Sequence, residues 1–155
     1  IGRLVGSEMC IRDRDMTARI IDVGAGDILD REGAFSGIEP ILWGALLEAL
    51  SGRSAYRKAI GPIIEQNPMI DFVFKAPTFP RSLFFCIDML RRELKLLPKH
   101  KDPLAHADKV RRRLQRYRNS DNDRAKLHKF IDSMQIALIQ LNAEITARWF
   151  IQHSE

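Results

Sequence analysis

A continuous apolar seam near the C-terminus constrains the fold of this 155-residue chain more than any other feature. Its members recur at spacings of four, three, four, three and four: Leu127, Ile131, Met134, Leu138, Leu141 and Ile145. Spacing close to 3.6 residues places them all on one side of an α-helix. Such a stripe is stable only when other elements cover it, so we predict a helix over about 123–152 that packs into a bundle.

The same period runs through most of the preceding chain. It predicts further helices at 15–31, 38–50, 53–60, 81–97 and 103–118, and at 63–76 either one helix or two turns, the second of which opens at Pro68. Asn67 and Asp102 are the predicted N-caps of two of them, each followed by a proline in the first turn. No segment alternates in polarity as a half-buried strand would. The predicted fold class is therefore all-α, a mostly antiparallel bundle of about five to seven helices.

Two of these helices have apolar faces that can be named in advance. In 81–97 the stripe contains Leu83, Cys86, Ile87, Leu90, Leu94 and Leu97. In 38–50 the broad face contains Ile41, Leu42, Ala45, Leu46, Ala49 and Leu50, with Trp43 and Leu47 alongside, and Ser51-Gly52 ends the helix. Cys86 is expected to be an inert core residue, because its neighbours are apolar rather than basic.

The first residues do not continue the helical pattern. The string VGSEMCIRDR at 5–14 resembles the translation of a sequencing adapter, and it has no amphipathic period. We therefore expect residues 1–14 to be a non-native tail, and residues 15–155 to form a single helical domain that has lost its natural beginning.

Composition narrows the class of protein. There are 25 Lys+Arg and 20 Asp+Glu, so the net charge is +5, which permits an anionic partner without requiring one. The two cysteines are too few for a disulfide-held secreted domain, which indicates a cytoplasmic location. No apolar run approaches the roughly 18 residues of a membrane span. The four histidines meet no metal-ligand spacing, so we expect no metal and no cofactor.

The segment KVRRRLQRYR at 109–118 is the strongest charge feature. Four of its cations define a predicted basic surface: Arg111, Arg112, Arg113 and Arg116. A solvated helix face is the simplest interpretation, and an anion-binding or nucleic-acid-binding surface is the alternative. Aromatic residues do not alternate with the cations, which argues against binding of single strands.

A second group of residues suits an anion. Arg81 and Ser82 follow Pro80 at a predicted helix start, where backbone N–H groups are free. Arg19, at the edge of the apolar face of 15–31, could reach the same cleft and complete a site for a carboxylate. In the alternative interpretation each arginine pairs with a nearby acid, Arg19 with Asp15 or Asp22 and Arg81 with Asp71 or another loop acid. No catalytic motif is present, so the catalytic residues are unknown.

The order of several segments resembles the bacterial alpha-E domain family. The matching stretches are TARIIDV at 17–23, WGALLEALSGRSAYRK at 43–58, FPRSLFFCIDMLRRELKLLP at 79–98 and LHKFIDSMQIALIQLNAEI at 127–145, with RWF at 148–150. The family is named for its helices and a Glu-Arg motif in the first helix. By alignment that motif falls at 12–13, where Arg12 and Asp13 stand instead, so this sequence departs from the family at the motif.

The resemblance implies a helical accessory or scaffold domain. Such proteins are associated with ATP-grasp-type ligases in a peptide synthesis or modification system. We therefore expect a ligase partner, a peptide or amino-acid ligand, and no chemistry of the domain's own. The alternatives are an enzyme of the same pathway with a polar cleft between helices, and a nucleic-acid-binding module that uses 109–118. We expect no membrane association.

Overall fold

The computed structural model describes residues 39–118 and 124–150, and within them every regular element is helical. The helices are α2 (Glu39–Ala49), α3 (Arg53–Ala59), α4 (Gln66–Lys75), α5 (Leu83–Leu94), α6 (Lys101–Arg116) and α7 (Arg124–Ile145). A short π-helical turn, Thr146–Phe150, extends α7. The all-α prediction is confirmed, while the helix expected at 15–31 and the tail expected at 1–14 lie outside the described residues.

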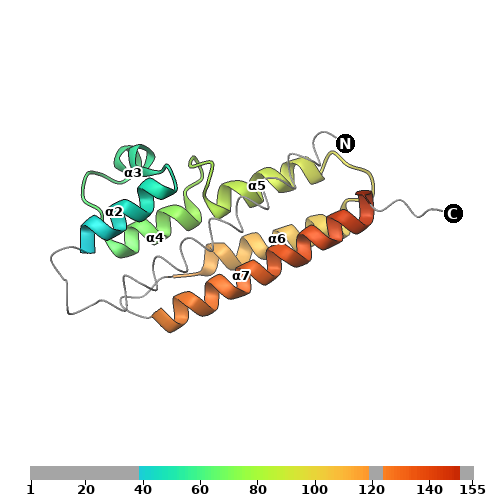
Figure 1. The fold of residues 1–155 in the computed structure, drawn as a ribbon. Coiled ribbons are helices and arrows are strands. Elements are labelled where there is room, and N and C mark those ends of the chain that lie inside the picture. Colours follow the sequence, from blue (N-terminus) through green and yellow to red (C-terminus); the bar gives the residue numbers. More distant parts are fainter. Residues whose placement is uncertain (1–38, 119–123, 151–155) are drawn as a thin grey trace.

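The helices are arranged in an elongated bundle (Figure 1). The three long helices α5, α6 and α7 follow one another in antiparallel order, and α6 contacts both of the others. The shorter helices α2, α3 and α4 gather at one end, where α4 packs against α2, α5 and α6. Because consecutive helices are joined by short connections, the antiparallel arrangement is the expected one.

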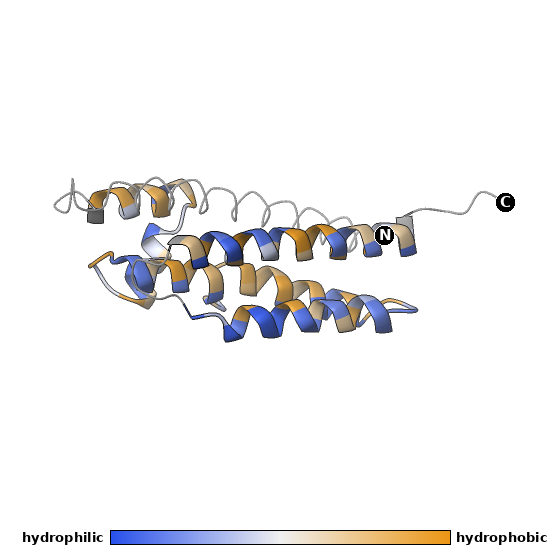
Figure 2. Cartoon of the chain, turned by 90° about the horizontal axis from the view of Figure 1, so that it is seen from below, coloured by the Kyte–Doolittle hydropathy of each residue, from blue (hydrophilic) through white to orange (hydrophobic). Residues whose placement is uncertain are grey.

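The seam of α7 is buried as predicted. Each of its members is at most 2% exposed: Leu127, Ile131, Met134, Leu138, Leu141 and Ile145. On α5 the predicted stripe is buried from Leu83 to Leu94. Polar residues predominate on α6, which is the most hydrophilic of the long helices (Figure 2). The core therefore lies between α5, α7 and the narrow apolar side of α6, and it continues into the end of the bundle formed by α2, α3 and α4.

Helix α2 buries a narrower face than the sequence predicts. Trp43, Leu46, Leu47 and Leu50 are buried, whereas Ile41 is largely exposed. Ala45 and Ala49, also assigned to the buried face, are exposed. The face centred on Trp43 and Leu47 is buried instead, because these large side chains remove more apolar surface from water than two alanines do.

Capping at the helix starts differs from the prediction in two places. α4 begins at Gln66 with Glu65 as its N-cap, so Asn67 is not the cap and Pro68 lies inside the first turn. α6 begins at Lys101 with His100 as its N-cap, which places Asp102 in the first turn rather than before it. There the Asp102 carboxylate lies near the positive end of the helix dipole. This interaction stabilises the helix although Asp102 makes no cap hydrogen bond.

The end of α2 is a Schellman motif, in which two backbone N–H groups close the last turn. The N–H of Gly52 donates to the Leu47 carbonyl at 2.9 Å, and the N–H of Ser51 donates to the Glu48 carbonyl at 2.8 Å. The sequence prediction that Ser51-Gly52 ends this helix is confirmed. The left-handed residue is Ser51, at φ 55°, and not the glycine.

Candidate functional site

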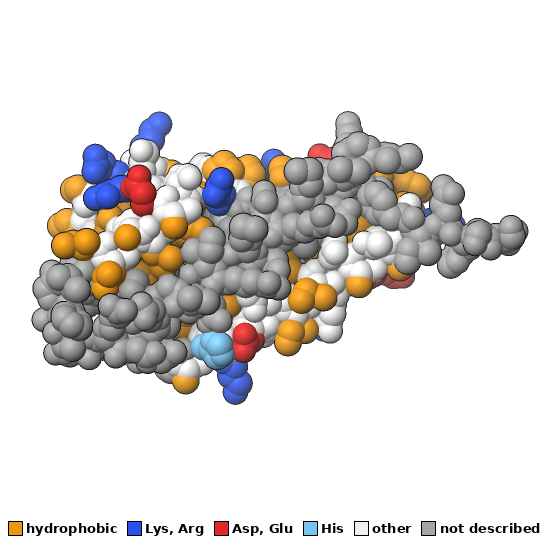
Figure 3. Space-filling view, in the orientation of Figure 1, with side chains coloured by type: hydrophobic (Ala, Val, Ile, Leu, Met, Phe, Trp, Pro, Cys, Tyr) orange, Lys and Arg blue, Asp and Glu red, His pale blue; other side chains and the backbone are white. Residues whose placement is uncertain are grey.

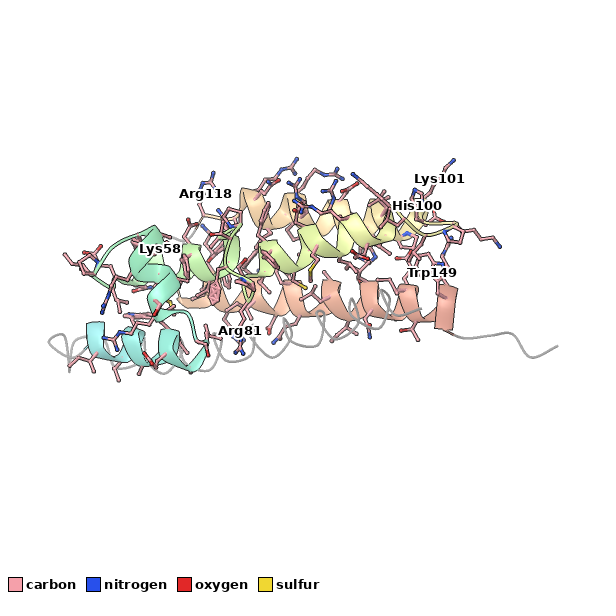
Figure 4. The ribbon with its side chains drawn as sticks, turned by 90° about the horizontal axis from the view of Figure 1, so that it is seen from above. Lys58, Arg81, His100, Lys101, Arg118 and Trp149 are labelled. Atoms are coloured by element: carbon pink, nitrogen blue, oxygen red, sulfur yellow. The ribbon has the colours of Figure 1, made fainter. Side chains whose placement is uncertain are left out.

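The exposed face of α6 carries most of the basic surface that the sequence predicts. Arg112, Arg113 and Arg116 are exposed, and Lys109 joins them one turn before Arg113. On the opposite face of the same helix, Val110 and Leu114 are buried in the core. Figure 4 shows cationic side chains projecting along this edge of the bundle, between the labelled Lys101 and Arg118.

Arg111 does not share that exposed face. Its guanidinium lies 5.1 Å from the centre of the Phe84 ring, and its Nε lies 3.5 Å from the Asp88 carboxylate on α5. A half-buried arginine stacked on an aromatic ring and paired with an acid fastens one helix to its neighbour. Arg111 therefore belongs to the α5–α6 interface rather than to the free basic surface.

Further ion pairs complete this interface. Asp88 also pairs with Arg91 at 3.4 Å and with Arg92 at 3.0 Å, and Arg91 reaches across to Asp108 on α6. These pairs engage both Asp88 and Asp108. Among the described residues, no carboxylate forms an ion pair with Lys109, Arg112, Arg113 or Arg116. We call these four residues the basic stripe.

A groove of about 590 Å³ runs between α6 and α7, beside the basic stripe. The α6 wall contains Ala105, His106, Lys109 and Arg113, with Val110 at the base. The α7 wall contains Ser133, Ile136, Ala137 and Gln140. The buried side chains of Val110 and Ala137 make its floor apolar, while its rim is cationic on one side only. Its volume is in the usual range for ligand sites.

Two polar side chains of the groove are already engaged within the protein. His106 Nδ1 lies 2.9 Å from Glu144 Oε2, which links α6 to α7, and the Ser133 hydroxyl donates to the Phe130 carbonyl at 2.8 Å. The ammonium of Lys109 and the guanidinium of Arg113 are the groove's charged groups without such a partner in the described part of the chain. The groove can therefore offer two positive charges beside an apolar floor.

The anion site expected at the start of α5 is only partly visible. Ser82 is fully buried and acts as the N-cap, with its hydroxyl accepting from the Phe85 N–H at 3.0 Å and donating to the Ala76 carbonyl at 2.6 Å. Arg81 is exposed, and Figure 4 places it on the opposite side of the bundle from Arg118. Arg19 lies outside the described residues. The pairing of Arg19 with Arg81 stays a prediction, and the Ser82 hydroxyl serves the helix.

A second hollow, of about 540 Å³, lies near the junction of α4, α5 and α6. Its cations are satisfied internally: Lys75 pairs with Asp71 at 3.4 Å and donates to the Tyr117 carbonyl, and Arg118 donates to the Gln115 carbonyl at 2.9 Å. A ligand anion would have to displace these contacts. This hollow is therefore a weaker candidate than the α6–α7 groove.

The described residues contain neither an exposed thiol nor a cluster of metal-ligating side chains. Cys86 is fully buried, as expected of a core thiol. Within residues 39–118 and 124–150, no three His, Cys, Asp or Glu side chains are grouped so that they could hold a metal ion. The same part of the chain contains no helix that is long and apolar enough to cross a membrane.

The groove itself is not predicted by the sequence. His106 and Glu144 are 38 positions apart, and nothing in their spacing indicates that they meet. The available signal was the small residues Ala105, Ser133 and Ala137, which leave room where two helices pack. That signal has meaning only once α6 and α7 are known to be neighbours.

Comparison with protein families gives one clear result. The family model of Alpha-E, described as a predicted alpha-helical domain with a conserved ER motif, matches residues 13–150. Comparison with curated proteins and with solved structures finds no match. The family match covers nearly the whole sequence and agrees with the helical architecture seen here. The chain belongs to the Alpha-E family of helical domains.

Proposed function

We propose that this chain is a helical binding domain that acts with an ATP-grasp-type amide-bond-forming ligase in a peptide synthesis or modification system, and that it does no chemistry of its own. The observation that supports binding is the basic stripe, whose cations face solvent beside an open groove. Cations left unpaired at a surface attract an acidic partner and accelerate its association. The ligase is suggested by the family resemblance, and a peptide or amino acid is the ligand that such a pathway would supply.

Co-purification of the full chain with an ATP-grasp-type ligase that is encoded beside it tests this proposal. We expect a stoichiometric complex in size-exclusion chromatography with light scattering, and a higher yield of amide product when the domain is present. A ligase that elutes alone and works equally well without the domain would contradict the proposal. Because the proposed contact is electrostatic, the complex should also weaken as salt is raised.

The His106–Glu144 pair favours one alternative, an enzyme of the same pathway. A histidine held by a carboxylate at the edge of a groove is an arrangement that acid–base catalysis uses. In the binding proposal the pair simply joins α6 to α7. His106→Gln, which can keep a hydrogen bond to Glu144, separates the two: product formation by the purified complex should persist if the domain only binds, and should fail if His106 transfers a proton.

A further inference from the structure

The groove between α6 and α7 has the dimensions and charge of a docking site for a helix. Its α6 wall extends from Ala105 to Arg113, which corresponds to about 12 Å of helix, or a little over two turns. A single ion would fill a small part of this length. We propose that the groove receives one acidic amphipathic helix of a partner protein, a proposal that rests on the proposed function only for the partner's identity.

The positions of the cations argue for a helical occupant. Lys109, Arg113 and Arg116 follow one another at spacings of four and three along the exposed side of α6. They span about 10 Å, which equals two turns of a partner helix lying alongside. Carboxylates at positions i, i+4 and i+7 of such a helix would meet all three cations in register, and Arg–carboxylate pairs can be bidentate.

The other side of the groove supplies apolar contact. Ile136, which lines the groove on α7, is 56% exposed although its side chain is large and apolar. Figure 3 shows hydrophobic side chains on the surface over this helix. Across the groove, Ala105 and Ala137 are small enough to let a second backbone approach closely. A helix with an apolar ridge and an acidic flank matches this division, which is how helices dock in grooves.

Charge and surface chemistry distinguish this occupant from two others. A second copy of the chain would bring another net charge of +5 toward the same cations, which opposes self-association at this face. The phosphates of a nucleic acid duplex would satisfy the basic stripe, but a duplex offers no apolar ridge to cover Ile136. The acidic helix is the occupant that uses both walls.

The experiment measures fluorescence anisotropy of labelled synthetic peptides with the full chain. The main probe is an amphipathic helix of about 18 residues, long enough to form in water, with leucines on one face and glutamates beside them. The first control probe has the same composition in scrambled order, and the second carries lysine in place of glutamate. Saturable binding of the main probe, with neither control binding, is the expected result.

Variants of the protein locate the binding. The double variant Lys109→Glu with Arg113→Glu should bind the main probe about tenfold or more weakly, because it loses close charge pairs with the peptide. The matched control is Lys58→Glu on α3, an exposed cation at the far end of the bundle (Figure 4), which should change little. Ala105→Trp should block the groove without altering charge, while Ala59→Trp on α3 should not. Circular dichroism of each variant checks the fold.

Several outcomes would overturn the inference. Equal binding of the scrambled peptide would reduce the surface to nonspecific attraction. Full binding by the Lys109/Arg113 double variant or by Ala105→Trp would place the contact elsewhere. A duplex or single-stranded oligonucleotide that binds more tightly than the main probe would assign the stripe to nucleic acid. Sedimentation of a dimer that the double variant disrupts would assign the face to a second copy.

The ligase complex separates this inference from the proposed function. If the complex forms and survives Lys109→Glu with Arg113→Glu, the groove inference is wrong and the proposed function stands. If the acidic peptide binds in the groove but no ligase complex forms, the groove inference stands and the proposed partner is wrong.

Discussion

Tyr117 and Phe130 stack face to face, with 3.8 Å between ring centroids and 12° between ring planes. Tyr117 follows α6 directly and Phe130 lies in the second turn of α7, so the stack joins the two helices that form the groove. The Phe74 ring of α4 meets both, at centroid distances of 6.0 Å and 5.5 Å. This aromatic cluster fixes one end of the α6–α7 pair, while His106 and Glu144 fix the other.

The stack should contribute measurably to stability. In a double-mutant cycle of Tyr117→Leu and Phe130→Leu, we expect a coupling free energy of about 0.5–1.5 kcal/mol, the usual value of an aromatic pair beyond its buried area. Urea denaturation of the four proteins gives this coupling directly. Additive effects of the two substitutions would show that the rings contribute by burial alone.

Leu138 and Ile139 are adjacent on α7 and should respond differently to the loss of their side chains. Leu138 is 0% exposed in the centre of the seam, so Leu138→Ala should cost about 2–5 kcal/mol of unfolding free energy, through lost burial and the cavity left behind. Ile139→Ala should cost less than about 0.5 kcal/mol, since much of its side chain is already in water. Similar losses of unfolding free energy in the two variants would mean that α7 buries a different face from the one described.

The helices could be predicted because their apolar residues repeat with the period of an α-helix. The seam from Leu127 to Ile145 needs no knowledge of any other element. The boundaries could not be predicted as well, because caps depend on a few local contacts. Asn67 looks like a cap, yet the backbone of Glu65 already accepts from Met69 at 3.0 Å, and the helix starts earlier.

The candidate site could be predicted only in part. An exposed basic face follows from Arg112, Arg113 and Arg116, whose positions oppose Val110 and Leu114 on the helix. Arg111 lies away from that face because it contacts Asp88 and Phe84 on α5. The sequence alone does not show that these residues are neighbours, because only the packing of α5 against α6 brings them together. The groove likewise exists only because α7 lies antiparallel beside α6. The apolar period of a single helix does not predict which distant segments contact one another.

Gly52 and Ser51 should respond to substitution in opposite directions. A Cβ at Gly52 would lie 2.8 Å from the buried Phe79 ring and 3.1 Å from Leu47, so Gly52→Ala should cost about 1–3 kcal/mol through overpacking. Ser51 has the left-handed φ that glycine adopts freely, so Ser51→Gly should raise stability by up to about 1 kcal/mol. Thermal and urea denaturation would measure both changes. A neutral Gly52→Ala would mean that the Phe79 ring can shift.

Tyr56 should make the stability of the domain depend on pH in the alkaline range. Its side chain is 1% exposed and packs edge-on against Phe72, and its hydroxyl donates to the Ile63 carbonyl at 3.1 Å. Burial raises the pKa of Tyr56 above the usual 10.0, and the nearby Glu65 carboxylate adds to the increase. The unfolded chain therefore releases this proton at a lower pH than the folded chain does.

The sign of the effect follows from that difference. Above pH 10 the unfolded state binds fewer protons than the folded state, so stability falls as pH rises through the folded pKa, and it is unaffected by this group below pH 10. The Tyr56→Phe variant lacks the ionising group. Because it also lacks the hydrogen bond to Ile63, its unfolding free energy at neutral pH should be lower by about 0.5–1.5 kcal/mol. The stability difference between the two proteins, measured by urea denaturation from neutral to strongly alkaline pH, should shrink as pH rises. A constant difference would show that Tyr56 ionises equally easily in both states.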